Sequence, residues 1–172
     1  MTVLIDGNNL LHAARDIDPS DLLIGRSMLC DILGSWGERR HERVCIVFDG
    51  PAPAAPLAEQ IGHAALQVVF SGGGVSADAV LDRIIAAESA PRRLTVVSTD
   101  REVGQAGRRR GSRVMRSDAF WRQVRRDLAR PLSTPRTEPV EKEAGLDPQT
   151  TQEWLREFGV ADPPEDDPLA GR

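Results

Sequence analysis

Short apolar runs followed within three residues by an aspartate or a glycine recur along this chain, and stretches with helical periodicity separate them. The runs are Val3–Ile5, Arg43–Phe48, Leu66–Phe70, Leu94–Val97 and the shorter Arg113–Met115. Continuous apolar runs bounded by turn residues are typical of strands that are buried on both faces. Their alternation with helices predicts an α/β domain with a mostly parallel sheet of about five strands, flanked by helices.

Helical spacing of apolar residues fills most intervals between these runs. The clearest case runs from Ser20, a good N-cap residue, to Gly37, where we expect a packing helix to end. Further helices are expected after Ser76, over residues 101–110 and from Ser117 to Arg130. Residues 10–12 predict only a short irregular or helical piece. The proline- and alanine-rich residues 51–65 predict a crossover with a short helix near 57–61.

The chain is long enough to bury the core of one domain, which we place at residues 1–130. Residues 131–172 hold seven of the twelve prolines and many acids, a composition typical of a linker. One short amphipathic helix is expected there, near residues 148–158, with Trp154 and Phe158 in its apolar stripe. This helix either docks back on the domain or binds a protein partner.

The cysteines, the histidines and the lack of long apolar segments exclude several protein classes. Cys30 and Cys45 lie in apolar surroundings without CxxC spacing, so we interpret them as buried hydrophobes rather than a disulfide or metal site. His12 and His63 lack metal-type spacing and receive no catalytic role. No secretory leader and no apolar run of about 18 residues is present. We therefore expect a cytoplasmic protein without a membrane partner.

Charge is strongly segregated along the chain. Residues 1–100 carry 8 basic and 13 acidic side chains, residues 101–136 carry 11 and 3, and residues 137–172 carry 3 and 10. A polyanion responds to local potential rather than to the net charge of −4, so the middle block is a candidate phosphate-binding region. Its candidate substrate contacts are Arg101, Arg108, Arg109 and Arg110. Phe120 and Trp121, in the same block, are expected to pack the last helix on the sheet.

Four aspartates occupy positions that a parallel sheet would bring to one edge. They are Asp6, Asp49 and Asp100, which each follow a buried strand, and Asp78, which opens a helix after a glycine loop. The ends of parallel strands and the starts of the helices that follow share one edge, so these carboxylates are expected to converge. Any one of them alone is also an ordinary turn or helix-cap residue. Four together predict a site.

Converging carboxylates repel one another unless a cation lies among them. Mg²⁺ and Mn²⁺ prefer oxygen ligands and are commonly held by one or two carboxylates and a phosphate. Such a site activates water for in-line attack on a phosphodiester, so the predicted chemistry is phosphodiester hydrolysis. Asp82, on the same helix face as Asp78, is a fifth acid of the site, a partner of Arg83 or a solvated helix residue.

Other polar residues near the predicted strand ends have two interpretations each. Asn8 either contacts a phosphate or water at the site, which we favour, or closes the turn after the first strand. Ser98 and Thr99 either contact a phosphate or cap the next helix. The run Gly72-Gly73-Gly74 lacks the lysine of a P-loop and does not fit GxGxxG, so it is interpreted as a flexible loop.

The ordered motifs of residues 2–127 resemble the NYN-domain branch of the PIN-like nucleases, particularly the YacP-type ribonucleases. The motifs are IDGNNLL, VFDG, SADAVLDRII and VVSTDREV with RRRGSRVMRSDAF. The resemblance implies a PIN-like Rossmannoid fold and a metal-dependent endoribonuclease, with some members acting on RNA at the ribosome. It also assigns the four strand-end and helix-start acids to Asp6, Asp49, Asp78 and Asp100, and the asparagine of the DGxN motif to Asn8. Related chains tend to have a glutamate where Asp82 stands.

The prediction is therefore a divalent-metal-dependent endoribonuclease, and two other classes stay open. A non-catalytic RNA- or ribosome-binding adaptor would keep the fold without turnover, but acids that repel phosphate give a pure binder no advantage. A phosphatase-like α/β enzyme would release phosphate from small phosphomonoesters. It would need a second aspartate where this chain has Asn8.

Overall fold

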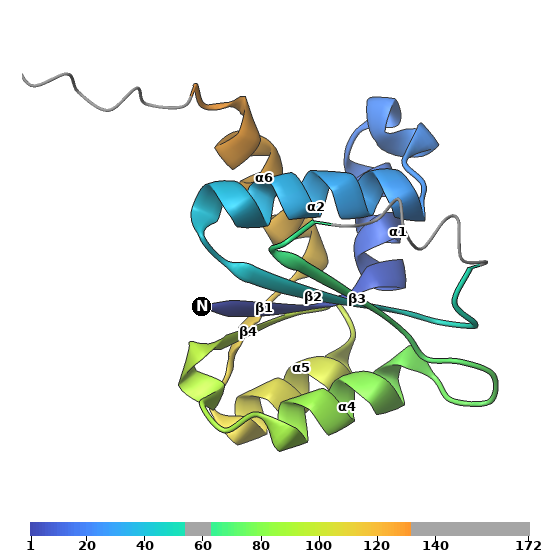
Figure 1. The fold of residues 1–172 in the computed structure, drawn as a ribbon, viewed down its shortest axis with the longest axis vertical. Helices are drawn as coiled ribbons and strands as arrows, with labels where there is room; N and C mark the ends of the chain where they lie inside the picture. Colours follow the sequence, from blue (N-terminus) through green and yellow to red (C-terminus); the bar gives the residue numbers. More distant parts are fainter. Residues whose placement is uncertain (54–62, 132–172) are drawn as a thin grey trace, which may run out of the picture. The chain divides into compact units, whose positions relative to one another are not determined.

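The computed structural model describes residues 1–53 and 63–131, and these form one sheet with helices on both faces (Figure 1). Five parallel strands lie in the order β3-β2-β1-β4-β5. The strands are β1 (Thr2–Asp6), β2 (Arg43–Phe48), β3 (Leu66–Phe70), β4 (Leu94–Val97) and β5 (Arg113–Met115). The predicted α/β class with a parallel five-stranded sheet is confirmed.

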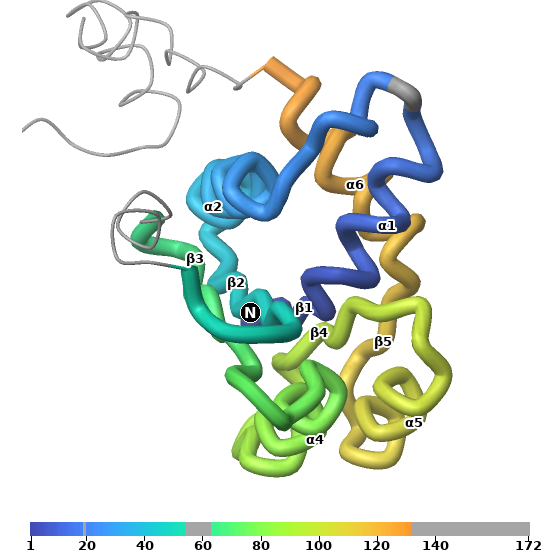
Figure 2. The backbone as a smooth tube through the Cα atoms, turned by 90° about the vertical axis from the view of Figure 1, so that its right-hand side faces the viewer, coloured from blue at the N-terminus to red at the C-terminus, as the bar shows by residue number. Residues whose placement is uncertain are grey.

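Helices connect the strands on both sides of the sheet. Within the described residues they are α1 (Gly7–Ile17), η1 (Pro19–Leu23), α2 (Arg26–Arg40), α4 (Ala77–Ala87), η2 (Pro91–Arg93), α5 (Arg101–Arg110) and α6 (Ser117–Ala129). Helices α1, α2 and α6 cover one face and α4 and α5 cover the other, as both backbone views show (Figures 1 and 2). All strands therefore end at one edge, called here the carboxyl edge, and begin at the opposite amino edge.

Two apolar clusters hold these layers together, one on each face of the sheet. Successive side chains of β1 point to opposite faces, so Val3 and Ile5 join the cluster under α1, α2 and α6, whereas Leu4 joins the cluster under α4 and α5. Phe120 and Trp121 of α6 are buried in the first cluster. They pack the last helix on the sheet, as predicted.

The second helix begins at Arg26, so the predicted start at Ser20 is wrong. The intervening residues form the 3-10 helix η1, which Asp18 caps by accepting a hydrogen bond from the backbone N–H of Ser20 at 2.8 Å. Leu22 and Leu23 are 59% and 92% exposed, so they are not part of the packed stripe. The spacing of Leu22 and Leu23 matches an α-helix, but the capping bond to Asp18 stabilises a 3-10 helix instead.

Two further helix predictions are corrected by close packing at the helix ends. Gly37 does not end α2 but lies inside it, where a Cβ would stand 3.1 Å from Cγ2 of Val44 on β2. The helix ends instead at His41, which is in the left-handed conformation. The piece expected at residues 10–12 is helical, one of the two alternatives, but α1 is longer than expected at 11 residues, because Asp6 caps it and Leu10 on its inner side is buried.

The cysteines are free thiols, as predicted. Cys30 is buried and Cys45 is half-buried. Burial raises the pKa of the Cys30 thiol to about 12 and that of Cys45 to about 11. Neither thiol is ionised near neutral pH, so both behave as small hydrophobic side chains.

Some predictions fall on residues that the structure does not describe. The described residues belong to the compact unit Met1–Pro131. The predicted crossover helix near 57–61 and the amphipathic helix near 148–158 lie outside the described residues. Among the described helices, none combines the length and the apolar character needed to cross a membrane.

Candidate active site

Asp6 is both the last residue of β1 and the N-cap of α1, and it is only 6% exposed. Its Oδ1 accepts a hydrogen bond from the backbone N–H of Asn9 at 3.0 Å, and its Oδ2 accepts one from the hydroxyl of Ser98 at 3.1 Å. Burial raises the pKa of Asp6 and these hydrogen bonds lower it, while the charges of Asp78 and Asp49 raise it further. The carboxylate is therefore held in one orientation, and its ionised form is disfavoured.

Asp49 follows β2 and joins three elements at the carboxyl edge. Its Oδ1 accepts a hydrogen bond from the backbone N–H of Ala77, the first residue of α4, at 2.6 Å. Its Oδ2 accepts one from the side-chain amide of Asn8 on α1 at 3.0 Å. The structure thus places Asn8 beside a predicted acid, and its predicted contact with substrate stays a prediction.

Asp78 is the residue on which the other acids act. Burial raises its pKa, and the charges of Asp100, Asp49, Asp82 and Glu102 then raise it further. Asp49, Asp78 and Asp100 are exposed. The four predicted acids therefore lie at one edge, where the charges of Asp49 and Asp100 disfavour ionisation of Asp78. In residues 1–53 and 63–131, however, no three His, Cys, Asp or Glu side chains are grouped closely enough to hold a metal ion.

Glu102 was not predicted to be near this site. It lies in the first turn of α5, where its backbone N–H donates to Oδ1 of the N-cap Asp100 at 2.6 Å. Acidic residues are common in the first helical turn because they complement the helix dipole. Nothing in the sequence indicated more for Glu102 than this helix-dipole role. In the structure its charge also raises the pKa of Asp78.

Ser98 positions the acids rather than presenting a free hydroxyl. The residue is buried, and its Oγ donates to Asp6 while it accepts a hydrogen bond from the backbone N–H of Asp100 at 3.0 Å. One hydroxyl therefore connects the acid that ends β1 with the acid that follows β4. Its predicted contact with a phosphate stays a prediction, because both of these bonds are internal to the protein.

Asn9 connects the loop after β4 with the start of α6. Its Oδ1 accepts hydrogen bonds from the backbone N–H of Thr99 at 2.9 Å and from the hydroxyl of the buried Ser117 at 2.6 Å. The backbone of Thr99 is thereby held beside α1, while its hydroxyl keeps its predicted role as a phosphate contact. This role of Asn9 was not predicted, since nothing in the local pattern pairs it with residues about 100 positions away.

Arg26 brings a cation to the carboxyl edge, and it was also missed. Its Nη2 donates to the backbone carbonyl of Asp49 at 3.2 Å and lies 3.4 Å from Oδ1 of Asn8. The guanidinium stands over the ring of Phe48, 5.1 Å from its centroid. This contact fixes the arginine beside the acids. No sequence pattern indicated that Arg26 lies near the acids, because it is a single exposed residue at the start of α2.

The predicted basic contacts are divided between the two edges of the sheet. Arg101 is the first residue of α5 and lies at the carboxyl edge beside Asp100. The run Arg108–Arg110 ends the same helix, about 15 Å away along a helix of 10 residues. Arg110 donates there to the backbone carbonyl of Glu88 at 2.9 Å. The predicted contact of this run with substrate stays a prediction, but it cannot be made beside Asp100.

A polar groove of about 450 Å³ adjoins the acids along α1 and α6. Its lining includes Asn9, whose backbone N–H donates to Asp6, and Thr99, which precedes Asp100. Its lining also includes His12, Arg116 and Arg122. Both arginines pair with Asp118, at 3.0 and 3.2 Å. The groove is therefore polar and partly neutralised, and its cations are fixed in place.

Comparison with known proteins agrees with this architecture. The model of the YacP-like NYN domain matches residues 3–158. The chain belongs to the YacP-like NYN domain family. The match continues past residue 127, where we expected the resemblance to stop, so part of the tail belongs to the family pattern.

Solved structures with the same fold include Rae1 (YacP) from Bacillus subtilis. One crystal structure is 21% identical with a TM-score of 0.60, and the alignment covers 92% of each chain. The crystal structure of a mutant form of Rae1 is 16% identical with a TM-score of 0.56, covering 96% of this chain and 87% of the other. Identities this low show a shared fold. No curated protein matches the chain significantly.

The acids of this YacP-like NYN domain fit a weakly enclosed divalent-ion site. Carboxylate oxygens are the donors that Mg²⁺ and Mn²⁺ prefer. Burial, and then the charges of neighbouring acids, raise the pKa of Asp78 and Asp6. The spacing of the described side chains does not make a closed protein cage. It fits an ion held by one or two carboxylates and completed by water and a phosphate.

We expect Mg²⁺ or Mn²⁺ to raise the melting temperature by a few degrees, and Asp78→Asn to reduce this shift. The folded-state pKa values of Asp6 and Asp78 lie above the ordinary 3.8. The stability linked to these groups is therefore present below pH 3.8 and is lost as the pH rises through the folded values. At neutral pH a cation that binds only the folded state should restore stability.

Thermal unfolding at pH 7 with each ion or with EDTA measures both effects. Without a divalent ion, Asp78→Asn should melt slightly above the wild type, because it removes a repelled charge. Asp31→Asn, an exposed acid of α2 near His63, is the matched control and should behave as the wild type. Equal ion-induced shifts in the Asp78 variant and the wild type would remove Asp78 from the metal site.

Proposed function

We propose that this chain is an endoribonuclease that hydrolyses RNA phosphodiester bonds with Mg²⁺ or Mn²⁺. The residues that carry the reaction in this proposal are Asp6, Asp49, Asp78 and Asp100. The main support is that a YacP-like NYN domain, from a PIN-like nuclease family, has these four carboxylates at one sheet edge. Burial and the charges of Asp100 and Asp49 raise the pKa of Asp78 there. Such a group of charges is compatible with neutral pH when a cation is bound.

In this proposal some side chains bind the metal ion and others orient the ion's ligands. A bound ion supplies activation of water and stabilisation of the phosphoryl charge. The exposed Asp49, Asp78 and Asp100 would hold it together with Asp6, which Asn9 and Ser98 keep in one orientation. The candidate fifth ligand is Asp82.

Two cationic groups are placed to receive the phosphate backbone next to the cleaved bond. Arg26 stands beside Asp49, and guanidinium groups suit phosphate geometry. The groove between α1 and α6 leads from Asn9 towards Arg116. An RNA strand in this groove would pass the acids and meet Arg116 and Arg122 beyond them, with Asp118 keeping both arginines in position.

Cleavage of labelled single-stranded and structured RNA by the purified chain tests the proposal. We expect internal scission with Mg²⁺ or Mn²⁺ and none with EDTA, because the acids alone repel the phosphate. Products longer than single nucleotides at early times identify an endonuclease. Scission that continues in EDTA would contradict the metal requirement.

The same assay separates catalysis from binding. RNA that is retained but never cut, with either ion and also in the presence of ribosomes, would favour the adaptor function. Scission only when ribosomes are present would favour a substrate presented there. Release of phosphate from small phosphomonoesters, with RNA untouched, would indicate a phosphatase.

A further inference from the structure

The amino edge of the sheet collects arginines from several separate segments. Arg43 opens β2 and Arg113 opens β5. Arg92 and Arg93 lie in η2 just before β4, and Arg108 and Arg109 lie at the end of α5, just before β5. All six are exposed, and together they are called the basic edge. Since β2 is six residues long, this edge lies about 20 Å from the acids.

The arginines of the basic edge are not neutralised as those of α6 are. Among the described residues, ion pairs involve Arg40, Arg116, Arg122, Arg125 and His63, and none of the six basic-edge arginines. Nearby Glu88 instead accepts a hydrogen bond from the backbone N–H of Ala90 at 2.8 Å. The two edges of one sheet therefore carry opposite charge.

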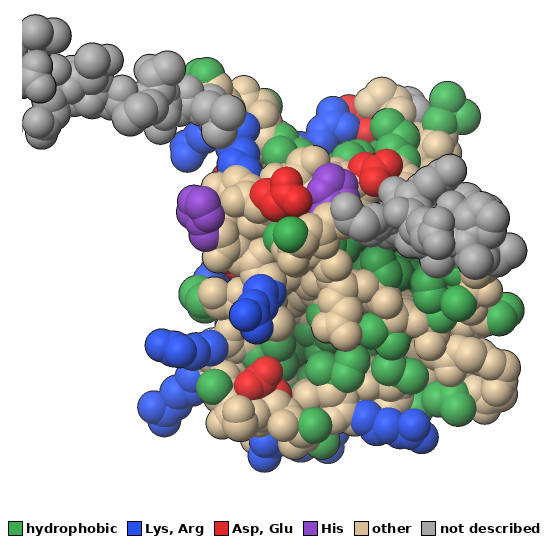
Figure 3. All heavy atoms as spheres, viewed as in Figure 1, with side chains coloured by type: hydrophobic (Ala, Val, Ile, Leu, Met, Phe, Trp, Pro, Cys, Tyr) green, Lys and Arg blue, Asp and Glu red, His purple; other side chains and the backbone are tan. Residues whose placement is uncertain are grey.

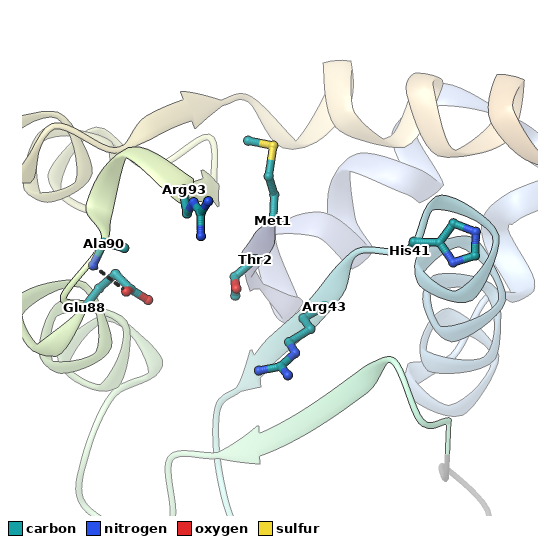
Figure 4. Close-up of a pocket in the computed structure, with 7 residues that line it drawn as sticks. All are labelled: Met1, Thr2, His41, Arg43, Glu88, Ala90 and Arg93. Atoms are coloured by element: carbon teal, nitrogen blue, oxygen red, sulfur yellow. Dashed lines mark hydrogen bonds between the residues drawn. The ribbon is translucent and has the colours of Figure 1, made fainter.

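A hollow of about 480 Å³ opens on this edge (Figure 4). Arg43, Arg93 and His41 line it from three different segments, around Thr2 at the start of β1. In the space-filling view, Lys and Arg side chains lie along the side of the molecule where β1 begins (Figure 3). Two of the six basic-edge arginines thus line a hollow, together with Glu88, and the other four lie along the same edge outside its lining.

We propose that the basic edge binds the phosphodiester backbone of RNA at a distance from the bond that is cleaved. This inference rests on the proposed ribonuclease function. The acids at the carboxyl edge repel a polyanion, and Asp118 partly neutralises Arg116 and Arg122 beside them. Further affinity for RNA is therefore expected from another part of the surface. Six exposed guanidinium groups along this edge supply it, and two of them line the hollow. Each can pair with a phosphate and release counterions.

Helix stability alone does not explain these arginines. Arg108 and Arg109 complement the dipole at the carboxyl end of α5, which is an ordinary structural role. Arg43 and Arg113 are in strands, where no such dipole acts. Their presence at the same edge favours a polyanionic ligand that contacts several segments at once.

Two double variants test the proposal: Arg92→Gln with Arg93→Gln, and Arg109→Gln with Arg113→Gln. Binding of a labelled 20-nucleotide RNA is measured by fluorescence anisotropy across a salt series, in the full chain carrying Asp6→Asn so that no cleavage intervenes. Each lost phosphate contact should lower the salt slope by about 0.7. Loss of two contacts corresponds to about 25-fold weaker binding at 0.1 M salt. Arg83→Gln, on α4, is the control.

Cleavage kinetics of the two double variants without Asp6→Asn show whether the RNA bound at the basic edge is the RNA that is cleaved. A higher KM with unchanged kcat would show that the cleaved RNA itself reaches the basic edge. An unchanged KM, with weaker binding of a non-cleaved duplex competitor, would show that a second RNA binds there. Affinities and salt slopes equal to those of the Arg83→Gln control would overturn the proposal and leave an acidic protein as the candidate ligand. Because binding is measured without turnover, this result is independent of whether the chain cleaves RNA.

Discussion

Asp6→Asn is expected to lower RNA cleavage by about 10²–10³-fold or more while the fold is retained. Among the four candidate acids Asp6 is the least exposed, and its two oxygens are held by Asn9 and Ser98. An asparagine has the same shape, accepts from the N–H of Asn9 through its Oδ1, and donates to the hydroxyl of Ser98. The substitution therefore removes the charge that would face the ion and substrate, with little change in packing.

Initial rates with saturating Mn²⁺ or Mg²⁺ and circular dichroism of the same preparations separate the two effects. The melting temperature of Asp6→Asn should equal or exceed that of the wild type, because burial disfavours the ionised form of Asp6. Asp31→Asn removes an acid far from the site and should keep full activity. Cleavage at the wild-type rate by Asp6→Asn would show that the reaction does not depend on this carboxylate.

Gly7→Ala is expected to lower the free energy of unfolding by about 1–3 kcal/mol or more, through overpacking. A Cβ at residue 7 would stand 2.5 Å from Cδ1 of Phe48 and 2.8 Å from the backbone carbonyl of Val47. Neither neighbour can move easily. The carbonyl belongs to the backbone of β2, and the Phe48 ring is buried between the Phe70 ring and the guanidinium of Arg26.

Urea unfolding of Gly7→Ala beside Gly73→Ala measures this effect. At Gly73 a Cβ would meet no atom within 4 Å, so its replacement should change stability by less than about 0.5 kcal/mol. Cleavage should fall in Gly7→Ala as well, because residue 7 lies between Asp6 and Asn8. Equal stability of the two variants would mean that the start of α1 does not require a glycine.

Much of the architecture followed from local patterns. Apolar runs without polar alternation predicted buried parallel strands, and a parallel sheet places all strand ends at one edge. The positions of Asp6 and Asp49 at that edge followed from this rule alone. Ser76 was predicted as an N-cap, and its hydroxyl accepts a hydrogen bond from the backbone N–H of Ala79 at 3.3 Å. Patterns of this kind suffice because they involve residues that are close in sequence.

Helix boundaries were predicted less well, because short-range competition decides them. Leu22 and Leu23 have helical spacing with the residues of α2, yet a capping bond from Asp18 favours a 3-10 turn and leaves both leucines exposed. Gly37 carried the usual signal of a helix end, but its missing side chain serves the packing of α2 against β2. Glycine can thus either end a helix or allow a helix to pack closely on a strand, and only the tertiary contact shows which applies at Gly37.

The sequence by itself determined the class of fold, the order of the strands along the chain and the edge to which the acids come. Only the tertiary structure decided which groups surround those acids. Asn9 meets Thr99 and Ser117, and Arg26 meets Asp49, across long sequence separations that no local period encodes. The direction of α5 likewise carries Arg108 and Arg109 to the opposite edge from Asp100. The physical reason is that backbone patterning specifies elements, whereas contacts between elements depend on how their side chains pack.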